Sequence, residues 1–467
     1  RFMKMTWALF ASFVVLLALF ITILKYSLPY LNDYKSNIET YLYDRLGAQI
    51  KIGQIDAKWQ PSGPVLILSD IELKASRQAP LDITLENTHV EIDFWQSLLQ
   101  QKLVSDSFVL SGIESYINSE VFYKVKPRSD GSQLLDNLSQ LFLSQLNSFS
   151  IQDSVIKVRH NNGRVQDYVI ESLRWLNSGN HHQASGDVYV DGFTKNTMSI
   201  IIELYGQQRQ DIFGQVYFNA QQIDVSPWLE QLTEEHVTLT SSSANFEAWG
   251  QINQGLVDDI IIDVKNSGIE WTNAGSKQLQ IKSALLQWQK DQDGWQAYGD
   301  NVVLASTEQA YSGFDLAVFS DANDTQLEIH DFDLSSVQSL FSLFSATGQS
   351  NALSKAELTG NVNSLLVKWQ PEQPVQAYSN ISKFGFEPAK VEGQAQLGIK
   401  DSNLDLYWYD NIGFAELNAE NGELITADTF SKEIAYSQMV MNIRMTQLEG
   451  YTSFTIPKLF LENDDVN

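Results

Sequence analysis

Apolar and polar residues alternate with a period of two along most of this chain, and this pattern restricts the fold more than any other feature. Val90, Ile92 and Phe94, for example, alternate with Glu91 and Asp93. Further apolar sets of this kind are Ile200 with Ile202, Val216 with Phe218, Ile260 with Ile262, and Leu397 with Ile399. Because successive side chains of a strand point to opposite faces of a sheet, each set predicts a strand with one apolar face.

The segments between these strands are rich in Asn, Asp, Gly and Ser, as in HNNG at 160–163 and KDQDG at 290–294. Such residues favour tight turns between antiparallel strands. Short helices are predicted at 134–146, from Ser226 onward, and at 334–344. The strand–helix–strand alternation of parallel sheets is not seen. The chain is therefore predicted to be mainly β, an antiparallel sheet with a few short helices.

A sheet with one apolar face must cover that face or close on itself. The predicted helices are too few to cover so many strands. Two arrangements remain open from the residues alone. Either two sheets pack face to face, or one sheet curls into a trough whose apolar lining faces something else.

The alternation changes phase at Gly53. Ile50 and Ile52 share one parity, whereas Ile55 and Trp59 share the other. The shift predicts a bulge or kink in one strand at Gly53 and Gln54. A plain turn between two short strands is the alternative.

About 20 uncharged residues run from Met5 to Leu24, between Lys4 and Lys25, and this length is enough to cross a bilayer core. A cleaved signal peptide is disfavoured because the apolar run is too long and no small-residue cleavage site follows. Positive charges on both sides leave the orientation undecided. The residues that we expect to mark the transmembrane helix are Met5, Trp7, Phe13, Leu17, Phe20 and Leu24.

The formal net charge of -26 argues against nucleic acid as a ligand and against adhesion to anionic lipid head groups. The absence of cysteine excludes disulfides and thiol chemistry. The densest histidine pair, His181 and His182, is predicted to lie in a loop and has no metal-ligand spacing. We therefore predict no catalytic residues, no metal and no cofactor.

Several pieces of the chain, in order, carry a family resemblance. The anchor is followed by LPYL at 28–31 and by RLGAQIKIGQIDAKWQPSGPVLILSDIEL from Arg45, and this opening resembles AsmA-like proteins. The YhdP branch of that family is resembled more specifically by four further segments: FWQSLL at 94–99, LFLSQLNSFSIQDSVIKV at 141–158, LRWLN at 173–177 and IDVSPWL at 223–229. Family members are longer, so the resemblance implies an N-terminal portion.

The resemblance implies a single-pass protein of the bacterial inner membrane with its N-terminus in the cytoplasm and its bulk in the periplasm. It implies a cytoplasmic stub and transmembrane helix at 1–26, a juxtamembrane helix at 27–47, and an elongated, twisted, taco-like β-groove at 48–467. The family is similar to bridge-like lipid transfer proteins, which implies a non-enzymatic carrier of phospholipid to the outer membrane. An outer-membrane or periplasmic partner is not identified.

We expect the groove to be lined by alternating apolar residues whose smooth walls let acyl chains slide. An assembly factor for outer-membrane proteins and a purely structural scaffold remain the alternatives. The candidate groove-lining residues are Ile50, Ile52, Val90, Ile92, Phe94, Ile200, Ile202, Val216, Phe218, Ile260, Ile262, Leu397 and Ile399.

Overall fold

The computed structural model describes most of the chain. The described residues are 2–46, 49–61, 63–74, 82–100, 105–118, 140–159, 165–190, 197–223, 225–226, 238–272, 276–291, 294–305, 311–321, 323–342, 357–370, 373–387, 396–427, 434–448 and 451–463. The chain divides into two compact units. Unit 1 comprises Arg1–Asn219 and Gln251–Leu256, and unit 2 comprises Ala220–Gly250 and Val257–Asn467.

Three helices in direct succession begin unit 1. They are α1 (Phe2–Ser27), the 3-10 helix η1 (Leu28–Tyr34) and α2 (Lys35–Leu46). Among the described residues, one helical run, from Met5 to Asp44, is long and apolar enough to cross a membrane. Its apolar part is α1, whose side chains are largely exposed because no other described segment packs around them. The predicted apolar helix is therefore present.

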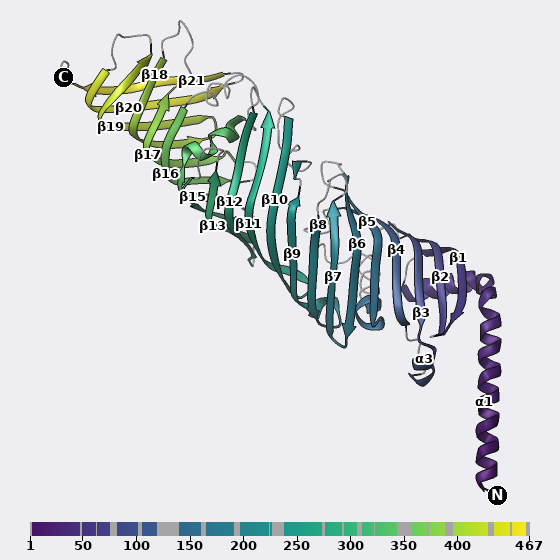
Figure 1. The fold of residues 1–467 in the computed structure, drawn as a ribbon. Coiled ribbons are helices and arrows are strands. Elements are labelled where there is room, and N and C mark those ends of the chain that lie inside the picture. The colour runs from purple at the N-terminus through teal and green to yellow at the C-terminus, as the bar shows by residue number, and fades with distance from the viewer. Residues whose placement is uncertain are drawn as a thin grey trace. The chain divides into compact units, whose positions relative to one another are not determined.

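The strands of unit 1 follow these helices, with three short helices between them (Figure 1). The strands are β1 (Gln49–Gln60), β2 (Gly63–Lys74), β3 (Asp82–Ile92), β4 (Ser105–Asn118), β5 (Ser148–Arg159), β6 (Val165–Ser178), β7 (His181–Val190), β8 (Thr197–Tyr205) and the first part of β9 (Phe213–Ile223). The helices are α3 (Phe94–Gln100), η2 (Leu141–Gln145) and η3 (Arg209–Asp211).

Unit 2 continues with strands and one further 3-10 helix, η4 (Leu334–Ser342). Its strands after β9 are β10 (Thr238–Asn253), β11 (Leu256–Thr272), β12 (Ser276–Lys290), β13 (Gly294–Ala305), β14 (Phe314–Asp321), β15 (Thr325–Asp333), β16 (Glu357–Trp369), β17 (Gln376–Glu387), β18 (Gln396–Tyr409), β19 (Ile412–Ala427), β20 (Ile434–Leu448) and β21 (Tyr451–Glu462).

The strands belong to one open, twisted sheet of 21 strands, which confirms the mainly β prediction. The described strands therefore do not form a two-sheet sandwich. Neighbouring strands pair antiparallel, as β1 with β2 and β19 with β20, but β4 and β5 pair in parallel. The expectation of antiparallel pairing is wrong at this pair. The chain from 119 to 147 is long enough for the crossover that a parallel pair requires.

Gly53 lies within β1, which runs unbroken through it, so the plain turn is wrong. The register with β2 is also unbroken, since Ile52 pairs with Ile71 and Gln54 with Ser69, and no residue is inserted. The side chains nevertheless change face, because Ile52 and Ile55 are both buried in one cluster. The predicted phase change is therefore a kink rather than an inserted bulge. A Cβ on Gly53 would lie only 2.7 Å from the Cβ of Asp70 across the strand pair.

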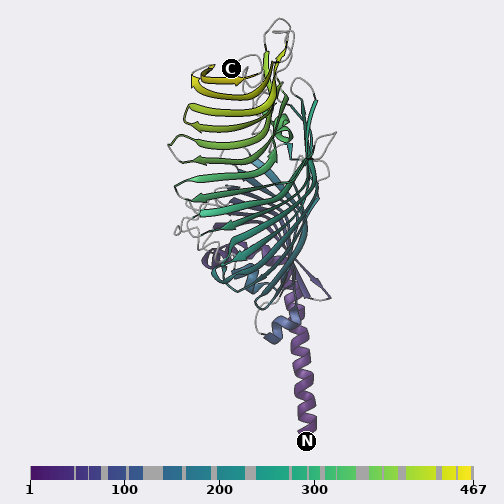
Figure 2. The same ribbon diagram turned by 90° about the vertical axis from the view of Figure 1, so that its left-hand side faces the viewer.

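Asp70 of β2, which lies across from Gly53, is a left-handed residue in mid-strand. Residues of the same kind recur in other strands. Such residues have φ between 38° and 57° and are Asp70, Asp153, Gln222, Asn266, Asn301, Asp331, Lys383, Asp401 and Asn421. Asn and Asp dominate because their short polar side chains tolerate this conformation best after glycine. In unit 2 the strands β15 to β21 are visibly bent (Figure 2).

Buried serines follow several of the left-handed residues and replace hydrogen bonds that the kink removes from the ladder. Ser154 Oγ accepts a hydrogen bond from the Ile113 backbone N–H at 3.0 Å. Ser402 Oγ, which is fully buried, donates to the Phe384 carbonyl at 2.9 Å. An unsatisfied buried backbone group would cost about 1–3 kcal/mol, so the hydrogen bonds of these hydroxyls offset part of the cost of the kinks.

Two local predictions are wrong. Phe94 does not continue the strand of Val90, because β3 ends at Ile92 and Asp93 caps α3 by accepting from the Gln96 N–H at 2.8 Å. The histidine pair at 181 is not in a loop, because β7 begins at His181 directly after the turn.

The remaining local expectations are met in part. Asp291 N donates to the Gly294 carbonyl at 3.0 Å, which confirms the turn predicted at 290–294. The helix predicted at 334–344 is the 3-10 helix η4. Of the helix predicted at 134–146, only residues 140–146 lie within the described part, and they contain the single π turn η2. The turn at 160–163 and the helix after Ser226 lie outside them.

Asp401, with φ of 54°, tests whether the left-handed kink sets stability. Asp401→Val should lower the free energy of unfolding by about 1–2 kcal/mol, because a branched Cβ clashes in this conformation. Asp401→Gly should stay within about 0.5 kcal/mol of the natural protein. Urea denaturation monitored by circular dichroism gives both values. Equal losses for the two variants would show that φ at this position is unimportant.

Candidate functional site

The inner side of the bend in unit 2 is a continuous apolar face. Strand register aligns one apolar residue from each strand of β15 to β21 in a single row: Phe332, Val362, Ile381, Leu404, Leu417, Met441 and Leu459. Val362 is 2% exposed and Leu417 4%. Ile399 and Tyr436, from the far side of the kinks, join the same buried cluster. Residues on both sides of the kinks therefore meet inside the bend.

The opposite face of these strands carries a polar row, alongside exposed apolar side chains such as Leu366 and Phe414. Asn363 Nδ2 donates to Asn380 Oδ1 at 2.7 Å, and Asn380 Nδ2 donates to Asp405 Oδ1 at 2.8 Å. The Tyr378 hydroxyl also donates to Asp405, at 3.2 Å. Such a row of amides and carboxylates suits contact with water. The sheet is therefore amphipathic across its thickness.

Unit 1 carries an apolar face of the same kind. Phe149, Trp175, Ala184 and Ile202 lie opposite one another on β5 to β8. The rings of Phe149 and Trp175 stack at 5.5 Å. Ile201, the neighbour of Ile202, points to the other face and is 53% exposed.

The apolar face continues into β9. The ring of Phe213 stacks on Tyr205 at 5.4 Å, on the face opposite to Leu204. Because side chains alternate along a strand, Val216 and Phe218 then share the face of Leu204 and Ile202.

Short helices cover parts of the apolar face. Near the N-terminus, Leu31, Ile38 and Leu42 of η1 and α2 pack on Ile50 and Ile52 of β1. Over β5, the Phe142 ring of η2 contacts the Phe149 ring at 4.9 Å. In unit 2, Leu334 and Val337 of η4 are the only residues outside strands, among those the structure describes, that pack on the large cluster.

The same N-terminal helices also close the free edge of β1. Glu39 Oε1 accepts from the Ile52 N–H at 2.8 Å, and Asn32 Oδ1 accepts from the Ile55 N–H at 3.1 Å. Lys35 Nζ donates to the Gly53 carbonyl at 3.3 Å. These contacts occupy backbone groups that would otherwise be open to pairing with another strand.

The sequence-predicted apolar residues can now be located. Ile50 and Ile52 lie under α2, and Val90 shares its face with Leu66 and Phe108. Phe94 lies against the Trp59 ring at 5.4 Å. Ile260 and Ile262 lie opposite Trp288 and Leu286, and Ile399 belongs to the large cluster. Ile92 lies two residues after Val90 in β3 and therefore shares its face. The side chain of Leu397 lies outside the described residues.

Sequence reasoning missed central members of the face, such as Val362 and Ile381. Val362 and Leu365 lie on one face in spite of their odd spacing, because β16 has a register shift between Val362 and Ser364. The Asn–Val–Asn–Ser run around Val362 carries the only available signal, since Asn is frequent at irregular strand positions.

The histidine pair makes separate structural contacts. His182 is fully buried, with Nδ1 2.7 Å from Asn177 Oδ1 and Nε2 2.6 Å from the Gly206 carbonyl. His181 lies on the other face, with Nε2 2.9 Å from Glu203 Oε1. That hydrogen bond is the main reason why the pKa of Glu203 is lowered. The two rings cannot share one metal ion.

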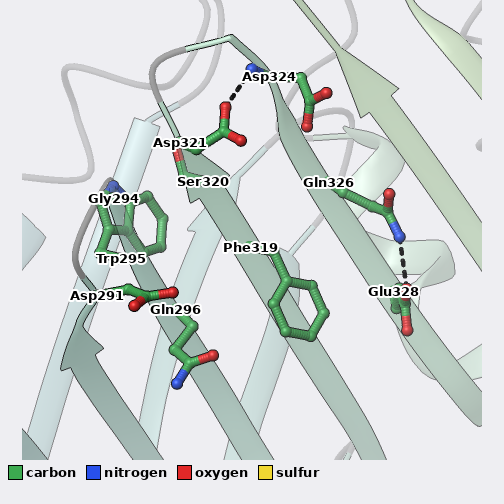
Figure 3. A pocket seen from close by; sticks show the side chains of 10 residues that line it. All are labelled: Asp291, Gly294, Trp295, Gln296, Phe319, Ser320, Asp321, Asp324, Gln326 and Glu328. Atoms are coloured by element: carbon green, nitrogen blue, oxygen red, sulfur yellow. Dashed lines mark hydrogen bonds between the residues drawn. The ribbon is translucent and has the colours of Figure 1, made fainter.

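A hollow of about 360 Å³ lies by the turns that join β12 to β13 and β14 to β15 (Figure 3). Its carboxylates serve local structure. Asp321 accepts from the backbone N–H of Asp324 at 2.9 Å and from that of Asn323, and these bonds lower its pKa. Asp324 lies 2.7 Å from Lys368 Nζ. Among the described residues, no group of three or more His, Asp or Glu side chains is placed to hold a metal ion.

An apolar N-terminal helix followed by one open sheet with an apolar inner face defines the chain as an open β-groove protein. The model of the YhdP protein family matches residues 1–467, and the chain belongs to this family. Over 291 residues it is 26% identical to the intermembrane phospholipid transporter YhdP of Escherichia coli (strain K12). This stretch covers 61% of the chain and 22% of that relative, so the chain spans less than a quarter of its length. No solved structure matches the chain.

Two substitutions in β16 test the difference between the faces. Val362→Asp should lower the free energy of unfolding by at least about 3 kcal/mol, because a carboxylate would be buried without a partner. Leu366→Asp, at a side chain 37% exposed on the polar face, should cost less than about 1 kcal/mol. Urea midpoints measure both. Similar losses would contradict the assignment of the faces.

Proposed function

We propose that the apolar face binds phospholipid acyl chains and conducts them between the inner and outer membranes of a bacterial envelope. The observation that carries this proposal is the unbroken apolar row on the inside of the bend, backed by a polar face. One sheet with these two faces suits a ligand that is apolar along its length. The Escherichia coli relative is an intermembrane phospholipid transporter, and this similarity supports the same conclusion.

The physical advantage of such a face is large. Each CH2 group kept from water is worth about 0.8 kcal/mol. Two exposed acyl chains would therefore cost tens of kcal/mol, roughly, on crossing an aqueous compartment. A continuous apolar face removes this barrier without a catalytic group. The head group remains in water at the open side, so no head-group site is required.

In this proposal α1 crosses the inner membrane, with residues before Met5 in the cytoplasm and the sheet in the periplasm. The lining is formed by Ile200, Ile202, Val216 and Phe218 in unit 1. In unit 2 it is formed by Ile260, Ile262 and Ile399 with the central row. The protein acts as a passive conduit rather than an enzyme.

Adjacent isoleucines on opposite faces test the proposal. A photo-crosslinking amino acid at Ile202 should capture phospholipid in cells, whereas the same group at Ile201 should not, because it points to the polar face. Mass spectrometry of the purified adducts identifies the captured molecule. Ile262 and Ile261 form a second matched pair.

The other outcomes separate the alternatives. Peptide adducts at Ile202 would favour an assembly factor for outer-membrane proteins. Adducts at neither position would favour a structural scaffold. Equal lipid capture at Ile201 and Ile202 would show that the faces do not distinguish lipid.

The helices η1 and α2 that pack on β1 give a separate expectation. At Ile52, which is 3% exposed beneath α2, the same crosslinker should join β1 to α2 within the chain rather than capture lipid. Lipid would then reach the apolar face beyond β1. Lipid adducts at Ile52 instead would show that α2 leaves this position in cells, and digestion with mass spectrometry distinguishes the two products.

A further inference from the structure

The helix α3 presents an apolar face to the outside of unit 1. Trp95, Leu98 and Leu99 are spaced i, i+3 and i+4, so they lie on one side of the helix. Their exposed fractions are 52%, 48% and 83%. Three apolar side chains exposed side by side form a contiguous patch, and such patches mark contact surfaces.

This exposed face is held in place by the fold. Asp93, directly after β3, accepts hydrogen bonds from the Gln96 N–H and, through its carbonyl, from the Ser97 N–H at 2.9 Å. The Phe94 ring contacts the Trp59 ring of β1 at 5.4 Å. One side of α3 is therefore fixed to the sheet, and the side with Trp95, Leu98 and Leu99 is turned away.

The position of α3 indicates what this face contacts. In both views α3 projects beyond the ends of β3 and β4 on the side toward which α1 runs (Figures 1 and 2). A bilayer crossed by α1 would thus meet α3 as well. Tyr26 and Tyr30, where the chain leaves α1, are 74% and 65% exposed, and tyrosine is typical of the boundary between membrane and water.

We propose that α3 is a second membrane contact, inserted by Trp95, Leu98 and Leu99 into the bilayer that α1 crosses. This inference rests on the membrane anchoring in the proposed function. Two contact points would hold the strand ends of unit 1 against the bilayer surface and prevent the sheet from pivoting about α1. Because α3 has no acidic residue in its first turn and no basic residue in its last, its insertion depends on apolar contact rather than on lipid charge.

Single cysteines test this inference cleanly, because the natural chain contains no cysteine. The variant Leu99→Cys carries a nitroxide label in the full chain, reconstituted in nanodiscs of phosphatidylcholine. Leu17→Cys in α1 serves as the reference inside the bilayer, and Leu176→Cys, 49% exposed on β6, as the reference in water. Ser97→Cys, about 160° around α3 from Leu99, is the matched control on the opposite side of the same helix.

The label at Leu99 should be accessible to oxygen and protected from a water-soluble nickel complex, as at Leu17. The label at Ser97 should be less accessible to oxygen than that at Leu99, and the label at Leu176 should be more accessible to nickel. Adding phosphatidylglycerol or salt should leave the Leu99 values unchanged.

Nickel accessibility at Leu99 equal to that at Leu176, with Leu17 protected, would overturn this inference alone and leave a protein partner as the occupant of α3. Equal oxygen accessibility at Ser97 and Leu99 would overturn the assignment to one face. Exposure of Leu17 itself would overturn the membrane anchor and this inference together.

Discussion

The whole structure depends on how a single sheet shields its one apolar face from water. In the described part of the chain no second layer of strands covers it, so the apolar side chains must be brought toward one another or left to a ligand. Left-handed residues in mid-strand bring the apolar side chains together. Each one reverses the alternation of side chains along its strand, so apolar residues at odd spacing share a face. The bend then places Ile399 and Leu404 in the same cluster although five positions separate them. Burial on the inside of the bend and polar contacts on the outside follow from this one device.

The bend requires that interrupted hydrogen bonds be replaced. Ser154, Ser267 and Ser402 each follow a left-handed Asp or Asn, and each hydroxyl bonds to the backbone of an adjacent strand. A small side chain is needed there because the position is buried in the angle of the kink. Side chains also replace backbone partners at the free edge of β1, where Glu39 of α2 and Asn32 of η1 bond to backbone groups that no strand pairs.

The helices have roles that a sandwich or a closed barrel would not need. They cover the apolar face only in places: α2 and η1 over β1, η2 over β5, and η4 near β12 and β16. The rest of the face is shielded mainly by contacts among its own side chains, which suits a surface that binds and releases an apolar ligand.

The charged groups lie elsewhere. On β4 and β5, for example, Lys157 lies 2.5 Å from Glu114, and their hydrogen bond lowers the pKa of that carboxyl and raises that of the lysine. Charge is thus kept on surfaces that face water.

The amino-acid sequence by itself determined the strand content, the apolar N-terminal helix and the family, because two-residue alternation and a long uncharged run are local properties of the chain. It also located the phase change at Gly53, but not its nature, since an inserted residue, a turn and a paired kink have the same local pattern. Phe94 was misassigned to a strand because Asp93 can alternate in a strand or cap a helix, and only the end of pairing at Ile92 decides between them. The single sheet, the parallel pair of β4 and β5, and the meeting of Val362 with Ile381 were decided by tertiary structure alone. Those features depend on register between strands far apart in the chain, and a sandwich core and a bent open sheet require the same apolar residues in each strand.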